Sequence, residues 1–385
     1  MKFIHFSDTH LGFSDLSRID PETGMNQREV DFYRAWERVI EAILDLKPDF
    51  VVHAGDLFQT PRPNNRALRI AAEGIQKVAN AGIPFVVVAG NHSTPRIRQT
   101  GSIFETIALF HNVYAAYRSR YERFRIGECA VHCIPHCSLT EELEAAYAAV
   151  EPDDGAKYQI LVTHGAWRES DDRLIGSVGE FNEQFLENPE KKTGLTFDYI
   201  ALGHYHKHLP VTDHAVYSGS TERTSFNEIG YTSGYVVVDL EQKSWQYHEI
   251  ESRPMLRLGP IDCSGLAATE IYDRLLELSP KVPEGALVRL ELDVLSRETL
   301  LSLDGQEIDR LFQQALYVEK ILNPALESGL QHTSASIGSL PVEFERYVQE
   351  LDEFGLDKER FLQIGQRLLQ SAEDEEQQME SSGDL

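Results

Sequence analysis

The sequence predicts an α/β protein in which helices cover a layered core of β-strands. From residue 1 to about 250, short runs rich in β-branched and aromatic residues alternate with longer amphipathic helical patterns. With 385 residues, 42% hydrophobic and 25% charged, the chain is long enough for two or three packed domains. Gly (26) and Pro (16) are too few to prevent packing, which excludes collagen-like and mostly disordered chains.

Six strands are expected in the first 250 residues, each bounded by turn or polar residues. They are Lys2–Phe6, Phe50–Ala54, Pro84–Ala89, Tyr158–Thr163, Tyr199–Leu202 and Tyr235–Leu240. The first expected helix, Gln27–Leu46, has a continuous apolar face and ends before Pro48. The second, Asn64–Ala81, starts with an Asn cap and is followed by Gly82.

A change of pattern near Pro254 predicts a second, smaller unit. Its expected elements are a helix at Ile271–Leu278, a strand at Ala286–Val294 and a helix at Gly305–Leu322. A helical, strongly charged tail follows Pro341, and its end, SAEDEEQQMESSGDL, is predicted to be disordered. The expected domains are therefore 1–252, 253–338 and 339–385.

Residues that bind metal ions in proteins stand at the ends of five of the expected strands. Since the carboxyl ends of strands form the binding edge of open α/β sheets, we expect these side chains to meet at one rim. Seven such ligands suit two ions, and carboxylates mixed with imidazoles favour Mn²⁺, Fe²⁺ or Zn²⁺. Two neighbouring ions hold the attacking and leaving oxygens of a phosphoryl displacement, so the pattern predicts phosphoester hydrolysis. The set is Asp8, His10, Asp56, Asn91, His164, His204 and His206.

The order of these motifs, Asp-x-His, Gly-Asp, Gly-Asn-His, His and Gly-His-x-His, resembles that of the calcineurin-like metallophosphoesterases. Within this family, HFSDTHLG, GDLFQTPRP and IALGHYHKH are similar to the double-strand-break repair nucleases, namely the bacterial SbcD subunit and the meiotic-recombination-eleven family. The similarity spans about residues 1 to 225. It implies a β-sandwich core flanked by helices, a small α/β domain that caps the active site and selects DNA, and a helical tail.

The resemblance also implies a cofactor and a role for each motif residue. It implies a DNA exonuclease and endonuclease that uses two divalent ions, most often Mn²⁺. Asp8, His10, Asp56 and His206 would bind one ion, and Asp56, Asn91, His164 and His204 the other, with Asp56 as the bridge. His92 corresponds to the catalytic histidine, which stabilises the transition state and protonates the leaving sugar oxygen.

Two positions depart from the family pattern. Ser93 stands where the family usually has an acidic residue after the histidine of its third motif. Gln59 stands where many meiotic-recombination-eleven members carry a second histidine, although bacterial members often lack it. Neither change removes a predicted metal ligand.

The resemblance implies three partners: DNA, a second copy of the chain, and an SbcC-like ABC-type ATPase with a long coiled coil. Family members bind the base of that coiled coil through helices after the cap. Here the apolar residues at helical spacing are Phe344, Val348, Leu351, Phe354 and Leu356, then Phe361, Ile364, Leu368 and Leu369. Such helices suit a hydrophobic groove, but they equally suit packing against their own domain.

Two other functions remain open from the sequence. The same ligands serve phosphatases and phosphodiesterases that act on small molecules, because substrate choice depends on the surface around the ions. The departures at Ser93 and Gln59 also allow a DNA-end-binding scaffold subunit without hydrolytic activity.

The net charge of −26, from 36 Lys and Arg against 62 Asp and Glu, argues at first against binding to DNA. Residues 60–125, however, have 10 basic against 3 acidic residues. Phosphate binding and a solvated helix face both explain this excess. The arginines are Arg62, Arg66, Arg69, Arg96, Arg98, Arg118, Arg120, Arg123 and Arg125.

The remaining cysteine and histidine residues favour structural roles. Cys129, Cys133 and Cys137 lie near His132 and His136, but their spacing is not that of common zinc modules. The pattern RFRIGECAVHCIP is more typical of a hairpin with Gly127-Glu128 at the turn and buried thiols. The histidines outside the predicted ligand set favour structural or surface roles; for His208, which continues the motif in GHYHKH, contact with substrate is the alternative left open. The chain has neither a secretory-type start nor a membrane-spanning run, which predicts a cytoplasmic protein without a membrane partner.

Overall fold

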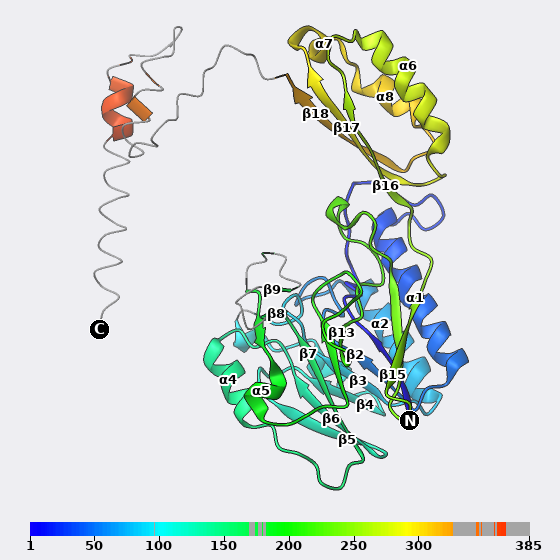
Figure 1. Cartoon of the computed structure of the whole chain (residues 1–385), viewed down its shortest axis with the longest axis vertical. Coiled ribbons are helices and arrows are strands. Elements are labelled where there is room, and N and C mark those ends of the chain that lie inside the picture. Colours follow the sequence, from blue (N-terminus) through cyan, green and yellow to red (C-terminus); the bar gives the residue numbers. More distant parts are fainter. Residues whose placement is uncertain are drawn as a thin grey trace. The chain divides into compact units, whose positions relative to one another are not determined.

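Two six-stranded sheets lie at the centre of the first 250 residues, with α1 and α2 on one outer side and α4 and α5 on the other (Figure 1). A computed structural model describes residues 1–95, 97–168, 174–175, 179, 182–325, 344–345, 348, 358 and 360–366. The chain divides into two units, residues 1–325 and 326–385. The predicted α/β class is confirmed; the three domain boundaries stay a prediction.

The first sheet has the strand order β15-β14-β1-β2-β3-β4. Its strands are β1 (Lys2–Phe6), β2 (Phe50–His53), β3 (Phe85–Val88), β4 (Val113–Ala116), β14 (Gly234–Asp239) and β15 (Ser244–Glu249). Strands β1 to β4 are parallel, whereas β14 and β15 add antiparallel strands at one edge.

The second sheet has the order β12-β13-β11-β7-β6-β5. Its strands are β5 (Glu122–Ile126), β6 (Cys129–Ile134), β7 (Tyr158–His164), β11 (Tyr199–Gly203), β12 (Leu209–Pro210) and β13 (Ala215–Tyr217). Between β7 and β11 in the chain, β8 (Ala166–Arg168), β9 (Leu174–Ile175) and β10 (Phe185–Glu187) form a small separate sheet.

Side-chain alternation explains why the two sheets pack face to face. In β1, Phe3 belongs to the core between the sheets, while Ile4 and Phe6 belong to the core under the helices. The second sheet contributes Val131 and Ile160 to the core between the sheets. Both faces of the central strands are therefore buried, as their nearly continuous apolar sequences require.

The hairpin and the buried thiols predicted around residue 127 are confirmed. Strands β5 and β6 pair antiparallel from Ile126 opposite Cys129, which leaves Gly127-Glu128 as the turn. Cys129 and Cys133 are free thiols in the core between the sheets, and burial raises the pKa of Cys129 to about 12.

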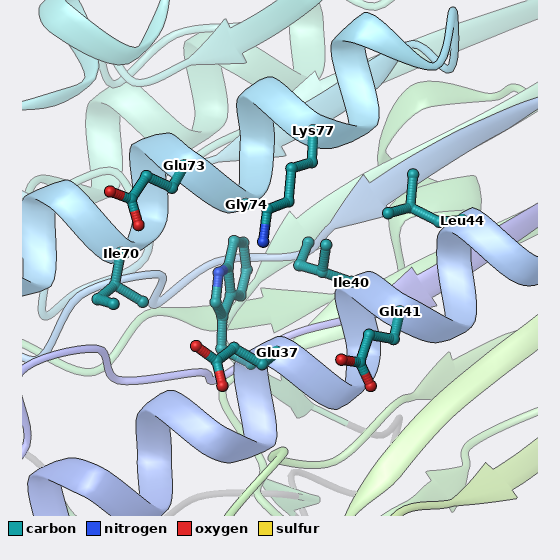
Figure 2. Close-up of a pocket in the computed structure, with 9 residues that line it drawn as sticks. Glu37, Ile40, Glu41, Leu44, Ile70, Glu73, Gly74 and Lys77 are labelled. Carbon is teal, nitrogen blue, oxygen red and sulfur yellow. The ribbon is translucent and has the colours of Figure 1, made fainter.

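Four helices cover the outer faces of the two sheets. They are α1 (Gln27–Leu46), α2 (Asn65–Asn80), α4 (Thr140–Ala148) and α5 (Pro189–Thr193); a short α3 (Phe104–Ile107) precedes β4. The side chain of Asn64 caps α2 by accepting the backbone N–H of Ala67 at 2.8 Å. A groove of about 290 Å³ lies between α1 and α2; Glu37 and Glu41 line it from α1, and Glu73 and Lys77 from α2 (Figure 2).

A three-stranded parallel sheet with its own hydrophobic core follows residue 254. Its order is β16 (Met255–Asp262), β17 (Leu287–Leu295) and β18 (Tyr317–Pro324), and it carries α6 (Ala268–Leu278), α7 (Arg297–Ser302) and α8 (Gly305–Leu311). Short 3₁₀ turns occur at Arg98–Thr100, Phe226–Glu228 and Ser279–Lys281.

The helix predicted at Gly305–Leu322 is wrong beyond Leu311. Residues Tyr317–Pro324 instead form β18, which pairs in parallel with β17 and sets Val318 beside Val288. Tyr, Val and Ile in this stretch favour a strand, and pairing with the central β17 provides the backbone hydrogen bonds.

No helix in the described part of the chain is long and apolar enough to cross a membrane.

Helices α1 and α2 approach closely because α2 has a glycine at the contact. A Cβ atom added to Gly74 would lie 2.4 Å from Nε1 of Trp36, whose side chain is 1% exposed. Replacing Gly74 with Ala should therefore destabilise the fold by about 1–3 kcal/mol, although Ala normally favours a helix. Urea unfolding measures this change.

Gly305, in the first turn of α8, is the matched control. A Cβ atom there finds its nearest neighbour at 3.9 Å, so Gly305→Ala should leave stability unchanged or raise it slightly. Equal effects of the two substitutions would contradict the close packing at Gly74.

Candidate metal centre

The predicted ligands follow strands of both sheets. Those of the first sheet come after β1, β2 and β3, where the parallel strands end together. In the second sheet, His164 is the last residue of β7, and it pairs with Gly203, directly before His204. The predicted ligands therefore come from two sheets rather than from the rim of one. The packing of the sheets brings the two sets of strand ends together.

Two buried carboxylates lie at the centre of the cluster. Asp8 is 0% and Asp56 1% exposed. Ligand atoms of Asp8, His10 and His206 all lie within 4.8 Å of one another, and so do those of Asp8, Asp56 and His164. Oδ2 of Asp56 is 3.1 Å from Nε2 of His164.

The strand-end turns hold their residues in unusual backbone conformations. Asp8, His10, Asp56 and His204 have φ values of 52°, 41°, 53° and 101°, all in the left-handed region that side chains rarely adopt. Such conformations persist when the surrounding structure stabilises them, and they concentrate at functional sites.

A glycine next to the cluster allows the strand ends to approach closely. A Cβ atom on Gly90 would lie 2.3 Å from Oδ1 of Asp56, which is too close for any other residue. This oxygen instead accepts the backbone N–H of His92 at 3.0 Å. Gly90, in the third motif, is therefore needed so that the Asp56 carboxylate can lie against the turn that follows β3.

The histidines are oriented as metal-binding imidazoles are. Nδ1 of His164 donates to the carbonyl of Ala54 at 2.9 Å, which leaves the lone pair on Nε2, near Asp56 and 2.9 Å from Oδ1 of Asn91. Nδ1 of His206 lies 2.8 Å from Oε1 of Glu228, while its Nε2 is 3.0 Å from Nε2 of His10. Metal-binding histidines are commonly fixed in this way by an oxygen acceptor on the second nitrogen.

His204 joins the cluster through its backbone and ring. Its N–H donates to both carboxylate oxygens of Asp8, at 3.1 Å each, and its ring lies edge-on to that of His164 at 5.3 Å. Its Nε2 is 2.6 Å from Oε1 of Glu183, so Nδ1 is the nitrogen left for an ion. The residues present thus fit a site for divalent metal ions.

His92 lies at the edge of the same cluster. A ligand atom of His92 lies within 4.8 Å of His10 and Asp56, and its Nδ1 donates to the carbonyl of Gln59 at 3.1 Å. Ser93 is fully buried, and its hydroxyl donates to the carbonyl of Phe58 at 3.4 Å. Position 93 thus offers no acidic group to orient His92. The carbonyl of Gln59 orients its ring through Nδ1.

The ionisation of the two carboxylates differs. Burial raises the pKa of Asp8 above its ordinary value. Burial acts in the same direction on Asp56, but His164, His92 and His10 outweigh it and hold its pKa well below the usual range. For His206 burial lowers the pKa, yet Glu228 outweighs this effect and raises the pKa to about 9.

Sequence reasoning did not identify Glu183 and Glu228. They occur in NEQF and FNEIG, which carry no recognisable motif, so only the three-dimensional contacts with His204 and His206 reveal them. The contacts of His208 agree with the structural role favoured for it: its Nδ1 donates to the carbonyl of Tyr217 at 3.0 Å, and its ring stacks on Tyr247 at 4.0 Å.

Several arginines of the basic segment are already bound within the protein. Arg123 donates to the carbonyls of Glu151 and Pro152, and Arg125 forms an ion pair with Asp153 at 3.0 Å. Arg69 is paired with Glu73 on α2. Arg96 and the side chain of Arg98 lie outside the described part of the chain. Much of the basic excess therefore serves internal contacts.

Fold and site together define a class: layered α/β proteins in which the strand ends of two packed sheets bring together residues that would hold divalent ions. Comparison with known proteins agrees. The family model described as calcineurin-like phosphoesterase matches residues 1–208.

Curated relatives from several archaea carry the name DNA double-strand break repair protein Mre11. The relative from Methanocaldococcus jannaschii is 41% identical over 285 residues, which cover 71% of this chain and 70% of that protein. The relative from Thermoplasma acidophilum is 30% identical over 269 residues (66% and 67%), and that from Methanococcus maripaludis 29% over 274 (66% and 68%). This chain belongs to the calcineurin-like phosphoesterase family, in its Mre11 branch.

The family uses a dinuclear metal site, so divalent ions should stabilise the folded chain. An ion that binds only the folded state adds about 2.7 kcal/mol when its free concentration is 100 times its Kd. Adding Mn²⁺ to chelator-treated protein should raise the melting temperature by several degrees, as scanning calorimetry measures. Asp56→Asn should lose most of this rise, whereas Asp153→Asn, on a surface loop, should keep it. The same melting temperature with chelator and with ion would contradict the metal site.

Proposed function

We propose that this chain is a Mn²⁺-dependent nuclease that hydrolyses phosphodiester bonds in DNA, as an exonuclease and endonuclease in end processing and double-strand-break repair. The cluster of two buried carboxylates and histidines at the strand ends carries the proposal. The names of the relatives favour DNA over small phosphoesters as the substrate.

The ligands divide between two ions. We assign Asp8, His10, Asp56 and His206 to one ion and Asp56, Asn91, His164 and His204 to the other. The contact of His206 with His10 and that of His164 with Asn91 support this division. When bound, such a pair of ions supplies a hydroxide nucleophile and positive charge for the phosphate oxygens.

His92 is the proposed catalytic acid. Its Nδ1 donates to the Gln59 carbonyl, so Nε2 is the ring nitrogen that we assign to proton transfer. A protonated Nε2 stabilises negative charge on the phosphate and donates its proton to the leaving sugar oxygen. Asp56 accepts the backbone N–H of the same residue, which fixes His92 relative to the ligands.

Substitution of His92 tests this function. His92→Ala should keep two Mn²⁺ ions per chain but lower the rate of oligonucleotide cleavage by about 10²–10⁴-fold, because it removes a general acid and no ligand. Elemental analysis and a gel assay on single-stranded, blunt and hairpin DNA measure the two quantities. His214→Ala is the matched control, since His214 pairs with Glu190 outside the cluster.

The other outcomes separate the alternatives. Unchanged cleavage by His92→Ala would contradict the assigned role. If the wild-type chain hydrolyses a generic aryl phosphodiester but not DNA, it is a small-molecule phosphodiesterase or phosphatase. A wild-type chain that hydrolyses neither substrate is a scaffold subunit.

We also propose that residues 253–338 form the DNA-selecting cap and that the chain forms a homodimer. Two contacts of Arg253 support a defined position for this cap. Arg253 forms an ion pair with Asp31 of α1 at 2.5 Å and donates to the carbonyl of Gly285 at 2.6 Å. The cytoplasmic location stays a prediction.

The tail is the proposed docking segment for a coiled-coil ABC-type ATPase of the SbcC kind. Among its described residues, Phe344 and Phe361 are in ring contact at 5.9 Å, and Gln366 donates to Glu345. Phe361 and Ile364 remain 38% and 48% exposed, which suits a further partner. Val348 is buried, at 1% exposed. The other predicted apolar positions, Leu351, Phe354, Leu356, Leu368 and Leu369, lie outside the described residues.

Deletion of residues 341–385 should abolish binding to the ATPase in a pull-down with purified partner. Deletion of residues 371–385 alone, which keeps both apolar runs, should retain it. If the longer deletion still binds the ATPase, docking through the tail is wrong.

A further inference from the structure

Two carboxylates stand directly behind two of the proposed ligand histidines. Oε1 of Glu183 is 2.6 Å from Nε2 of His204, and Oε1 of Glu228 is 2.8 Å from Nδ1 of His206. The Glu side chains are only 4% and 11% exposed, so both contacts are shielded from water. Neither carboxylate belongs to the seven proposed ligands.

We propose that Glu183 and Glu228 are positioning residues, each of which sets the affinity of one metal ion through its histidine. The inference rests on the metal centre of the proposed function. A carboxylate that accepts a ring N–H fixes the proton on that nitrogen and leaves the lone pair on the other. It also holds the plane of the ring and makes the ligating nitrogen more basic.

The two pairs act on different ions. His206 stands with the first set of ligands, since its Nε2 is 3.0 Å from Nε2 of His10. His204 belongs to the second set, beside the ring of His164. His164 uses the backbone carbonyl of Ala54 as its acceptor, so each proposed ion has one histidine that a glutamate holds.

Glu228 is itself held in place by hydrogen bonds to both carboxylate oxygens. Thr224 donates its backbone N–H to Oε2 at 2.8 Å and its hydroxyl to Oε1 at 2.6 Å. These bonds leave the carboxylate little freedom to turn away from His206. A flexible surface glutamate with an accidental contact would have no such support.

The segment that carries Glu183 is anchored in a similar way. The side chain of the adjacent Gln184 accepts the backbone N–H of Cys137 at 2.6 Å and donates to the carbonyl of His164 at 3.0 Å. Position 183 is therefore fixed relative to β7, whose last residue is a proposed ligand. Both glutamates thus have the rigid support that a positioning residue needs.

Titration of Mn²⁺ into the chelator-treated full-length chain tests the inference. Glu183→Gln and Glu228→Gln should each weaken binding of one of the two ions by about 10–100-fold and leave the other nearly unchanged. Calorimetry gives the affinities. Electron paramagnetic resonance should show uncoupled Mn²⁺ in each variant at ion concentrations that give the coupled pair in the wild-type chain.

Glu190→Gln is the matched control, because Glu190 lies 3.2 Å from Nε2 of His214 in a pair outside the cluster. It should leave both affinities unchanged. Thr224→Val keeps the Glu228 carboxylate but removes one of its donors, so it should weaken one ion to a smaller extent. This milder variant keeps the test valid if Glu228→Gln does not fold.

The result that overturns the inference is distinct from failure of the proposed function. Wild-type affinity for both ions in Glu183→Gln, and in Glu228→Gln or Thr224→Val, would make the positioning role wrong while the metal centre stands. A wild-type chain that binds no second ion would instead overturn the proposed dinuclear site itself. Equal weakening of both ions in every variant, including Glu190→Gln, would indicate a general loss of structure and reject specific positioning.

Discussion

The burial of two carboxylates in one cluster is the constraint on which the rest of the site depends. Asp8 and Asp56 are almost fully shielded from water, and ionised groups in such surroundings are costly unless opposite charge and hydrogen bonds compensate. The imidazoles of His164, His92 and His10 outweigh the burial of Asp56 and hold its pKa low, whereas burial keeps the pKa of Asp8 raised. The left-handed backbone at Asp8 and Asp56 is a further cost that the surrounding structure must stabilise.

The constraint extends to the packing of the sheets, because the proposed ligands come from both. The core that Phe3, Val52, Val131 and Ile160 build between the sheets sets their relative position. Next to the cluster, the backbone of His204 donates to Asp8. The hydroxyls of Ser7 and Ser218 also meet at 2.8 Å, joining the end of β1 to the segment after β13. The relative positions of the proposed ligands thus depend on a close-packed interior.

The sequence identifies residues whose type and place near a strand end are recognisable locally. It does not identify residues whose role depends on contacts that only folding creates. Asp56 stands out because it comes soon after the apolar strand β2, and His164 because it ends the apolar strand β7. Glu228 lies in no recognisable motif, and its proposed function depends on a contact with His206, which is 22 residues earlier in the sequence. The local pattern after α8 likewise predicts a helix where the structure has β18, because pairing with β17 overrides that pattern.

The segment from Ser218 to Glu228 links the metal centre to the sheet that follows residue 254. At its start Ser218 reaches Ser7, which donates to Asp8, and at its end Glu228 holds His206. Between them, Glu222 lies 3.3 Å from Arg28 and accepts the backbone N–H of Arg253 at 3.0 Å.

The same segment touches the following sheet directly. The guanidinium of Arg289, in β17, lies over the ring of Phe226 at 5.1 Å and donates to Asn227. Since Phe226 and Asn227 share one turn with Glu228, β17 contacts the same turn that supports His206. The sheet that follows residue 254 and the proposed ligand His206 are therefore joined by a short series of direct contacts.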